Sequence, residues 1–234
     1  MNWLERIIHP LALPAELAER RAAWRKVPEA NPALIPRRWV VVDTETSGLD
    51  TARGSLIAIG AVAIEQDEIV VAPAFEAVLR QQTPSARENI EIHGVGAEAQ
   101  AQGEEPAAAL MRFLEFERND PQIAYHVAFD AAFLRRAIVA NLDMRFTGEW
   151  VDIAVLAPRI FPEFARSPRG LDGWLARFGI DPVVRHNALA DAYATAQLFQ
   201  IVARRAARDG HKRLCDLQAL AGEEAALRAR QPTA

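Results

Sequence analysis

Two acidic residues after an apolar run are the strongest chemical signal in this sequence. The run Trp39–Val42 predicts a buried strand. Asp43 and Glu45 follow it with the spacing i, i+2, which places both side chains on one face of a strand. Neighbouring carboxylates repel each other and lose hydration on burial, so folding alone does not favour the pair. Because Mg²⁺ and Mn²⁺ prefer oxygen ligands, the pattern predicts a divalent-cation site at the end of this strand.

Three later residues could complete such a site. Asp130 stands where an expected strand passes into a helix, and His186 precedes Asp191 by five positions at the start of the long final helix. Five residues rotate a regular helix by roughly 140°, so His186 and Asp191 would not share a face inside one helix. Both can face a common pocket if His186 lies in the preceding loop and Asp191 one turn inside the helix.

Each of these residues also has an ordinary structural interpretation. Asp130 could cap a helix N-terminus, and Asp191 could complement a helix dipole. His186 alone could be a surface-loop histidine, and Asp43 with Glu45 could simply mark a strand-end turn. Their occurrence together and in this order favours a shared divalent-cation site over these separate interpretations.

The elements that must position these residues are of the α/β type. The first three expected strands follow one another without a helix, whereas later strands alternate with helices, which predicts a mixed sheet flanked by helices. Pro73 indicates that the third strand lies at an edge of the sheet or ends there. The expected strands cover residues 39–43, 56–64, 68–76, 122–126 and 150–152, and the expected helices cover residues 106–117, 130–141, 153–160, 171–178 and 188–208.

Three segments are expected along the chain. Residues 1–37 read as a helical extension with a proline-rich linker, residues 38–209 as the main domain, and residues 210–234 as a charged tail. Trp3 and Trp24 in the extension are interpreted as packing anchors. The extension could hold a partner protein or cover an edge of the sheet.

Composition excludes several classes of protein. The net charge of −4 over 234 residues argues against a protein that coats duplex DNA without specificity. Cys215 is the single cysteine, so no intrachain disulfide can form, which suits a reducing compartment. The apolar run from Leu56 to Ile64 is too short to span a bilayer, and the N-terminal residues lack the apolar core of a signal peptide. A cytoplasmic protein without membrane contact is expected.

At the level of motifs, the chain resembles the DEDDh family of 3′–5′ exonucleases, and within it the proofreading epsilon subunits of bacterial DNA polymerase III. The resemblance covers residues 38–205 and implies a ribonuclease H-like fold. The chain departs from the family at His126, where Asn is usual, and at Ser47, where Thr is commoner. The motifs that carry the resemblance are Asp43 with Glu45, Asp130, and His186 with Asp191, supported by Ile92–Val95, Val151–Asp152 and Leu171–Leu175.

The resemblance also implies roles for these residues. Asp43, Glu45 and Asp191 would hold the cation that activates water. Asp43 and Asp130 would hold a second Mg²⁺ or Mn²⁺ on the leaving-group side. His186 would act as general base, a role that imidazole suits because its charge changes near physiological pH. His93 and His126 are interpreted as structural or substrate-adjacent. The residues expected to line the pocket for the terminal nucleotide are Thr44, Thr46, His93, Gly94, Val95 and Phe129.

The implied function is stepwise release of nucleoside 5′-monophosphates from a 3′ end, with single-stranded DNA as the preferred partner. Open alternatives are an RNA exonuclease of the oligoribonuclease type and a non-catalytic module of a polymerase or repair complex, recruited through residues 1–37 or the tail. A metal phosphatase is disfavoured because such sites generally use more histidines. Arginines dense around the third motif form either a solvated face or a path for a nucleic-acid strand; they are Arg159, Arg166, Arg169, Arg177 and Arg185.

Overall fold

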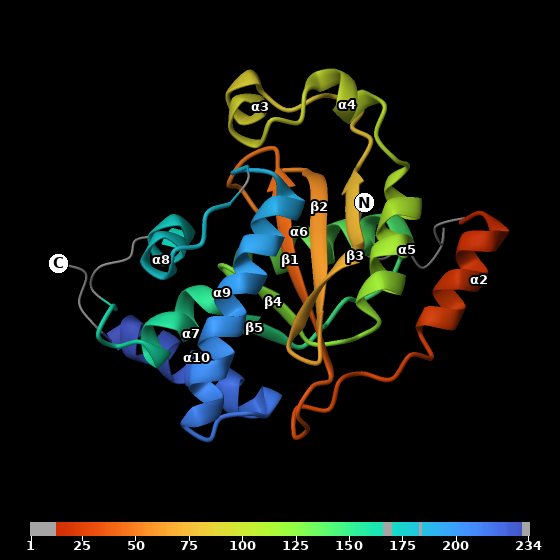
Figure 1. Cartoon of the computed structure of the whole chain (residues 1–234). Helices are drawn as coiled ribbons and strands as arrows, with labels where there is room; N and C mark the ends of the chain where they lie inside the picture. Colours follow the sequence, from red (N-terminus) through yellow and green to blue (C-terminus); the bar gives the residue numbers. More distant parts are fainter. Residues whose placement is uncertain (1–12, 166–169, 183, 231–234) are drawn as a thin grey trace.

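A five-stranded mixed sheet forms the centre of the molecule (Figure 1). The computed structural model describes residues 13–165, 170–182 and 184–230, with side chains as far as Gly222. The strand order is β3-β2-β1-β4-β5; β1 pairs antiparallel with β2 and parallel with β4. The strands are β1 (Arg38–Thr46), β2 (Leu56–Glu65), β3 (Glu68–Val78), β4 (Gln122–Ala124) and β5 (Trp150–Asp152).

Helices cover both faces of the sheet, as the alternation of strands and helices predicts. Val41 packs on the face covered by α7, α8, α9 and α10, whereas Val40 and Val42 pack on the face of α5 and α6. The central strand is therefore apolar on both sides, as is typical of a buried strand. The helices are α2 (Ala15–Trp24), α3 (Arg87–His93), α4 (Ala97–Ala101), α5 (Pro106–Glu117), α6 (Val127–Leu142), α7 (Ile153–Ile160), α8 (Gly170–Phe178), α9 (Ala188–Arg208) and α10 (Leu214–Arg230).

Several element boundaries differ from those predicted. β1 continues to Thr46 and so includes both acidic residues. Pro73 lies inside the edge strand β3, so the prediction of an edge is confirmed and that of a strand end is wrong. The strand expected as far as His126 ends at Ala124, and α6 begins at Val127, because His126 has a φ of 72° that neither a strand nor a helix allows.

The extension and the tail both contact the sheet domain. The Trp24 indole N–H donates to the Leu114 carbonyl at 2.8 Å, which confirms its packing role; Trp3 lies outside the described residues. At the other end, Leu214 and Leu217 of α10 are buried in the core. The Cys215 N–H donates to the carbonyl of Pro32 in the linker at 2.8 Å. Among the described residues, none of the helices combines the length and the apolar composition that crossing a membrane requires.

Candidate active site

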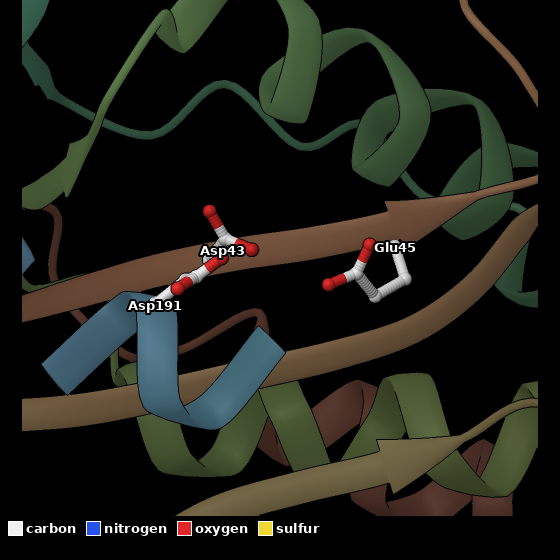
Figure 2. Close-up of side chains that lie close together, drawn as sticks. All are labelled: Asp43, Glu45 and Asp191. Carbon is white, nitrogen blue, oxygen red and sulfur yellow. The ribbon is translucent and has the colours of Figure 1, made fainter. Parts of the chain in front are cut away.

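Three carboxylates meet between the end of β1 and the first turn of α9 (Figure 2). Asp43, Glu45 and Asp191 each offer an oxygen atom, and these oxygens lie within 4.8 Å of one another. Asp43 and Glu45 share the face of β1 that α9 covers, as the alternation of side chains along a strand requires. We call these three residues the carboxylate cluster.

A glycine on the neighbouring strand allows α9 to come this close. Gly60 of β2 pairs with Asp43, and a Cβ atom at Gly60 would lie 2.2 Å from the backbone of Ala188 and Leu189. Only hydrogen fits in that space, so the first turn of α9, and Asp191 with it, can reach the sheet. Sequence reasoning placed Gly60 inside a buried strand and missed this role; an isolated glycine in an apolar strand was the available signal.

Burial and mutual repulsion perturb the cluster strongly. Burial raises the pKa of Asp43 well above its ordinary value, and the charges of Asp130, Glu45 and Asp191 raise it further. Burial, followed by the charges of Asp191 and Asp130, raises the pKa of Glu45 to about 7. Oxygen donors held together against their own repulsion form a set that fits a hard divalent cation.

Asp130 lies beside this cluster but outside it. Its carboxylate is buried in the first turn of α6 and accepts a hydrogen bond of 2.7 Å from the Thr44 hydroxyl. Burial raises the pKa of Asp130 to about 7, and the Thr44 hydrogen bond opposes that rise. Asp130 does not cap the helix, because His126 is the N-cap residue. Its charge nevertheless reaches the cluster, since it raises the pKa of Asp43.

His186 occupies the loop before α9, with Asp191 in the first helical turn. Its backbone N–H donates to Asp191 Oδ2 at 3.0 Å, and its own side chain is exposed. The helix is capped by Asn187, whose side-chain oxygen accepts from the Ala190 N–H at 3.0 Å. The loop arrangement that would let both side chains face one pocket is therefore present.

Arg185 is the residue that sequence reasoning placed least well. It was grouped with arginines on a surface, but its guanidinium donates to Asp191 Oδ1 of the cluster and to Asp172 Oδ1, the latter at 2.5 Å. Its charge lowers the pKa values of Asp43 and Glu45. Arg185 thus supplies the cluster with a resident positive charge. Of the other grouped arginines, Arg166 and Arg169 lie outside the described residues.

The hydroxyls of two threonines expected in the nucleotide pocket donate hydrogen bonds within the protein. The Thr44 hydroxyl is committed to Asp130, and the Thr46 hydroxyl donates to the Gly48 carbonyl at 2.9 Å. Phe129, in the first turn of α6, is half-buried, and its ring centroid lies 4.9 Å from that of Phe133. These residues surround the end of β1 at which the cluster lies.

The remaining pocket residues form a turn built on a buried histidine. His93 Nδ1 accepts from the Val95 N–H at 3.0 Å, and its Nε2 lies 3.3 Å from the Ser85 hydroxyl oxygen. Burial lowers the pKa of His93, which favours the neutral ring that accepting at Nδ1 requires. Gly94 ends α3 with a φ of 70°, a conformation suited to glycine. His93 therefore shapes the turn from within it.

The backbone conformation at position 126 restricts which side chains can occupy it. His126 adopts the left-handed conformation, which Asn, Asp and His enter more readily than other residues with side chains. Its N–H and that of Val127 donate to the two oxygens of Asp152, each at 3.1 Å. The departure from Asn is tolerated because histidine adopts this backbone too. Asp152 fixes the start of α6, and with it the location of Asp130.

Comparison with known proteins identifies relatives of this arrangement. The model of the exonuclease family RNase_T matches residues 40–199. The chain is 31% identical over 161 residues to a PolC-type DNA polymerase III of Thermotoga petrophila, and 27% identical over 182 residues to that of Bacillus subtilis. These matches cover 69% and 77% of this chain but only 11% and 12% of the relatives, so the chain spans about a tenth of their length.

Solved structures share the fold. Exonuclease I of E. coli in complex with a dT13 oligonucleotide superposes with a TM-score of 0.63 at 20% identity, covering 78% of this chain and 45% of that one. Exonuclease X in complex with 5′ overhanging duplex DNA superposes with a TM-score of 0.59 at 19% identity, covering 78% of this chain and 99% of that one. The sheet and its flanking helices are thus a ribonuclease H-like fold.

Proposed function

The chain belongs to the RNase_T exonuclease family, and from this membership we propose that it is a metal-dependent exonuclease that releases nucleoside 5′-monophosphates from the 3′ end of DNA. The observation that carries the proposal is the carboxylate cluster, in which Asp43, Glu45 and Asp191 converge in spite of their repulsion. A phosphodiester is anionic and resists an anionic nucleophile, so hydrolysis needs positive charge at such a place.

The carboxylates of this chain would hold two Mg²⁺ or Mn²⁺ ions. Asp43, Glu45 and Asp191 would bind one, and Asp43 with Asp130 would bind the other. When bound, such a pair neutralises charge on the attacking and leaving oxygens of the phosphodiester. The close approach of Ala188 and Leu189 to Gly60 brings the first turn of α9, which carries Asp191, to the sheet, and the Thr44 hydroxyl donates to Asp130.

His186 would take the proton from the attacking water. A neutral imidazole accepts a proton readily and is the side chain that most often serves as a general base. The backbone of His186 is tied to Asp191, while its side chain is exposed and so can meet a substrate bound at the cluster. This tie would keep the base beside the carboxylates during each cycle.

The terminal nucleotide would lie over the end of β1. Backbone amides of the Gly94–Val95 turn could meet the 3′-hydroxyl, and Phe129 could stack on a base. Thr44 and Thr46 would line the floor, and His93 would maintain the turn. DNA is the proposed substrate because the relatives are DNA polymerases, and the two structures with a similar fold hold a dT13 oligonucleotide and a 5′ overhanging DNA duplex. A polymerase or repair protein is a proposed partner of residues 1–37 or of the tail.

An assay with end-labelled oligonucleotides tests this function. Single-stranded DNA, a mispaired DNA duplex and matched RNA, each labelled at the 5′ end, are incubated with Mn²⁺ or with EDTA. We expect stepwise shortening from the 3′ end, dependent on Mn²⁺ and faster on DNA than on RNA. Asp191→Ala should abolish it, whereas Asp209→Ala, an exposed acid at the other end of α9, should not.

Four results would contradict the proposal. Shortening from the 5′ end would refute the polarity, and faster shortening of RNA would favour the oligoribonuclease alternative. Activity that survives Asp191→Ala would refute the ligand assignment. A folded protein that shortens none of the substrates would instead favour a non-catalytic module.

A further inference from the structure

A hollow lined by arginines lies past the end of β1, on the side of the sheet that α5 and α6 cover, whereas the carboxylate cluster lies on the side of α9. It has a volume of about 360 Å³ and receives Arg53 from the β1–β2 loop, Arg80 from the segment after β3 and Arg136 from α6. No aspartate or glutamate occurs among the described residues that line it. We call it the arginine hollow. Three segments far apart in sequence thus bring positive charge to one place, in a chain whose net charge is −4.

Two segments that line the arginine hollow, the β1–β2 loop and α6, also extend to the candidate active site. Gly54 and Ser55 of the loop line the hollow. The Ser55 N–H donates to Ser47 Oγ at 2.8 Å, and the Ser47 N–H donates to the Ser55 carbonyl at 2.9 Å. Ser47 follows Glu45 by two residues, so the hollow begins where the strand of the carboxylates ends.

The second segment is α6. Phe133 lines the hollow one turn after Asp130, and its ring contacts that of Phe129 at 4.9 Å between centroids. Arg136 follows Asp130 by six residues, which corresponds to about 9 Å along a helix axis. Stacked nucleotides rise about 3.4 Å each, as in a duplex, so this distance amounts to roughly two or three stacked nucleotides.

The arginines of the hollow are available to a ligand. Arg136 donates to the Thr51 carbonyl oxygen and lies 5.1 Å over the Phe133 ring, and it has no carboxylate partner among the described residues. Arg53 lies 3.9 Å from Asp50, and Arg80 lies 3.6 Å from Glu105. Both arginines are mostly exposed, and exposed pairs of this kind are worth about 1 kcal/mol or less. A phosphate can therefore replace these carboxylates.

We propose that the arginine hollow binds the phosphates of the DNA strand two or three nucleotides before its 3′ end. This inference rests on the proposed function, because it supplies the strand with a path away from the carboxylate cluster. Guanidinium groups suit phosphate oxygens through paired hydrogen bonds. The hollow also explains how an acidic chain can hold an anionic polymer: the positive charge is local.

Binding measurements on a non-cleaving background test the proposal. In Asp191→Ala protein with fixed Mg²⁺, fluorescence anisotropy follows single-stranded deoxyoligonucleotides of two and eight nucleotides over a series of salt concentrations. Arg53→Gln/Arg80→Gln/Arg136→Gln should weaken binding of the octamer at least tenfold. It should also reduce the salt slope by about 0.7 for each arginine lost, the value expected for single strands. Binding of the dinucleotide should change less than twofold, because it does not reach the hollow.

The control removes the same number of charges elsewhere. Arg118, Arg204 and Arg208 are exposed arginines that do not line the hollow, and their joint change to Gln should leave the salt slope for the octamer unaltered. If the triple variant unfolds, Arg53→Gln alone decides the matter, because this side chain is 90% exposed and its loss should lower the slope by about 0.7.

Two outcomes would overturn the proposal. If the variants of the arginine hollow fold but bind the octamer with unchanged affinity and salt slope, the proposal is wrong. Such a result would favour an acidic protein partner for these arginines. An equal loss for dinucleotide and octamer would place the effect at the carboxylate cluster. Failure of the proposed function is separate, since it appears as unshortened substrate with the wild-type chain even when the octamer binds.

Discussion

Acidic side chains lie at both ends of β1, Glu117 of α5 at its start and the half-buried Asp43 and Glu45 toward its end, and the two places differ in what surrounds the acids. At the start of the strand, Glu117 is fully buried and accepts hydrogen bonds from Gln122 Nε2 and from the Asn119 N–H, each at 3.0 Å. Burial raises its pKa to about 8. At the other end, burial raises the pKa values of Asp43 and Glu45 too, but there the charges of further carboxylates add to the effect.

This comparison shows that a raised pKa does not by itself identify a functional site. Glu117 is held by neutral donors and, as a neutral acid, needs no counter-charge. The carboxylate cluster contains acids that repel one another, and it is supplied with a cation, Arg185. Clustering therefore distinguishes the site from an isolated structural acid. Four substitutions can break or sharpen this distinction.

Asp43→Asn should have the largest effect. Because Asp43 is expected to contact both cations, replacing its carboxylate with the neutral amide of Asn should abolish the Mn²⁺ binding measured by calorimetry. Activity should be lost as well. Glu117→Gln is the matched control, since it makes the same chemical change in a buried acid at the other end of β1 and should leave Mn²⁺ binding intact. Unaltered Mn²⁺ affinity in Asp43→Asn would refute the distinction between the two ends.

His186→Ala should reduce turnover by about 10²–10⁴-fold, the usual span for loss of a general base. Binding of Mn²⁺ should persist, because the Asp191 carboxylate accepts from the backbone of residue 186 and not from its ring. Single-turnover kinetics with saturating Mn²⁺ measures the change, and His211→Ala serves as the control. A loss smaller than tenfold would show that another group takes the proton.

Glu117→Gln should change how stability depends on pH. The unfolded acid loses its proton near pH 4.5 and the folded one near pH 8, so the free energy of unfolding falls as pH rises through this interval. The fall is at most about 1.4 kcal/mol for each pH unit. Urea denaturation at pH 5.5 and 7.5 should therefore show a smaller decline for the Gln variant than for the wild type. Equal declines in the two proteins would indicate that the buried acid keeps its ordinary pKa. The control is Glu68→Gln, which changes an exposed acid of β3 and should show the same decline as the wild type.

Arg185→Gln should have the smallest effect, and its direction is informative. Without the guanidinium, a metal ion no longer competes for Asp191, so Mn²⁺ affinity should rise by about fivefold, equivalent to about 1 kcal/mol. The melting temperature in EDTA should fall, because the carboxylates lose their counter-charge. Arg204→Gln is the control for removal of a surface charge. A weaker affinity for Mn²⁺ would instead show that Arg185 helps to hold the site.

The elements and the order of the acids could be predicted from the sequence because both are encoded locally. Apolar runs and helical periodicity depend on neighbouring residues, and β2, α5, α9 and the mixed sheet were found where the pattern places them. The shared face of Asp43 and Glu45 likewise follows from the geometry of one strand. The sequence alone therefore determined the fold class and the acids from which the site is built.

Only the tertiary structure decided how those acids meet. Gly60 clears space for α9, Thr44 binds Asp130, and Arg185 reaches Asp191 and Asp172. The arginine hollow likewise joins residues from separate elements. Most of these contacts join residues distant along the chain, and the others depend on the path of a loop. The geometry of these contacts is set by how strands and helices pack, and this packing cannot be predicted from local sequence patterns.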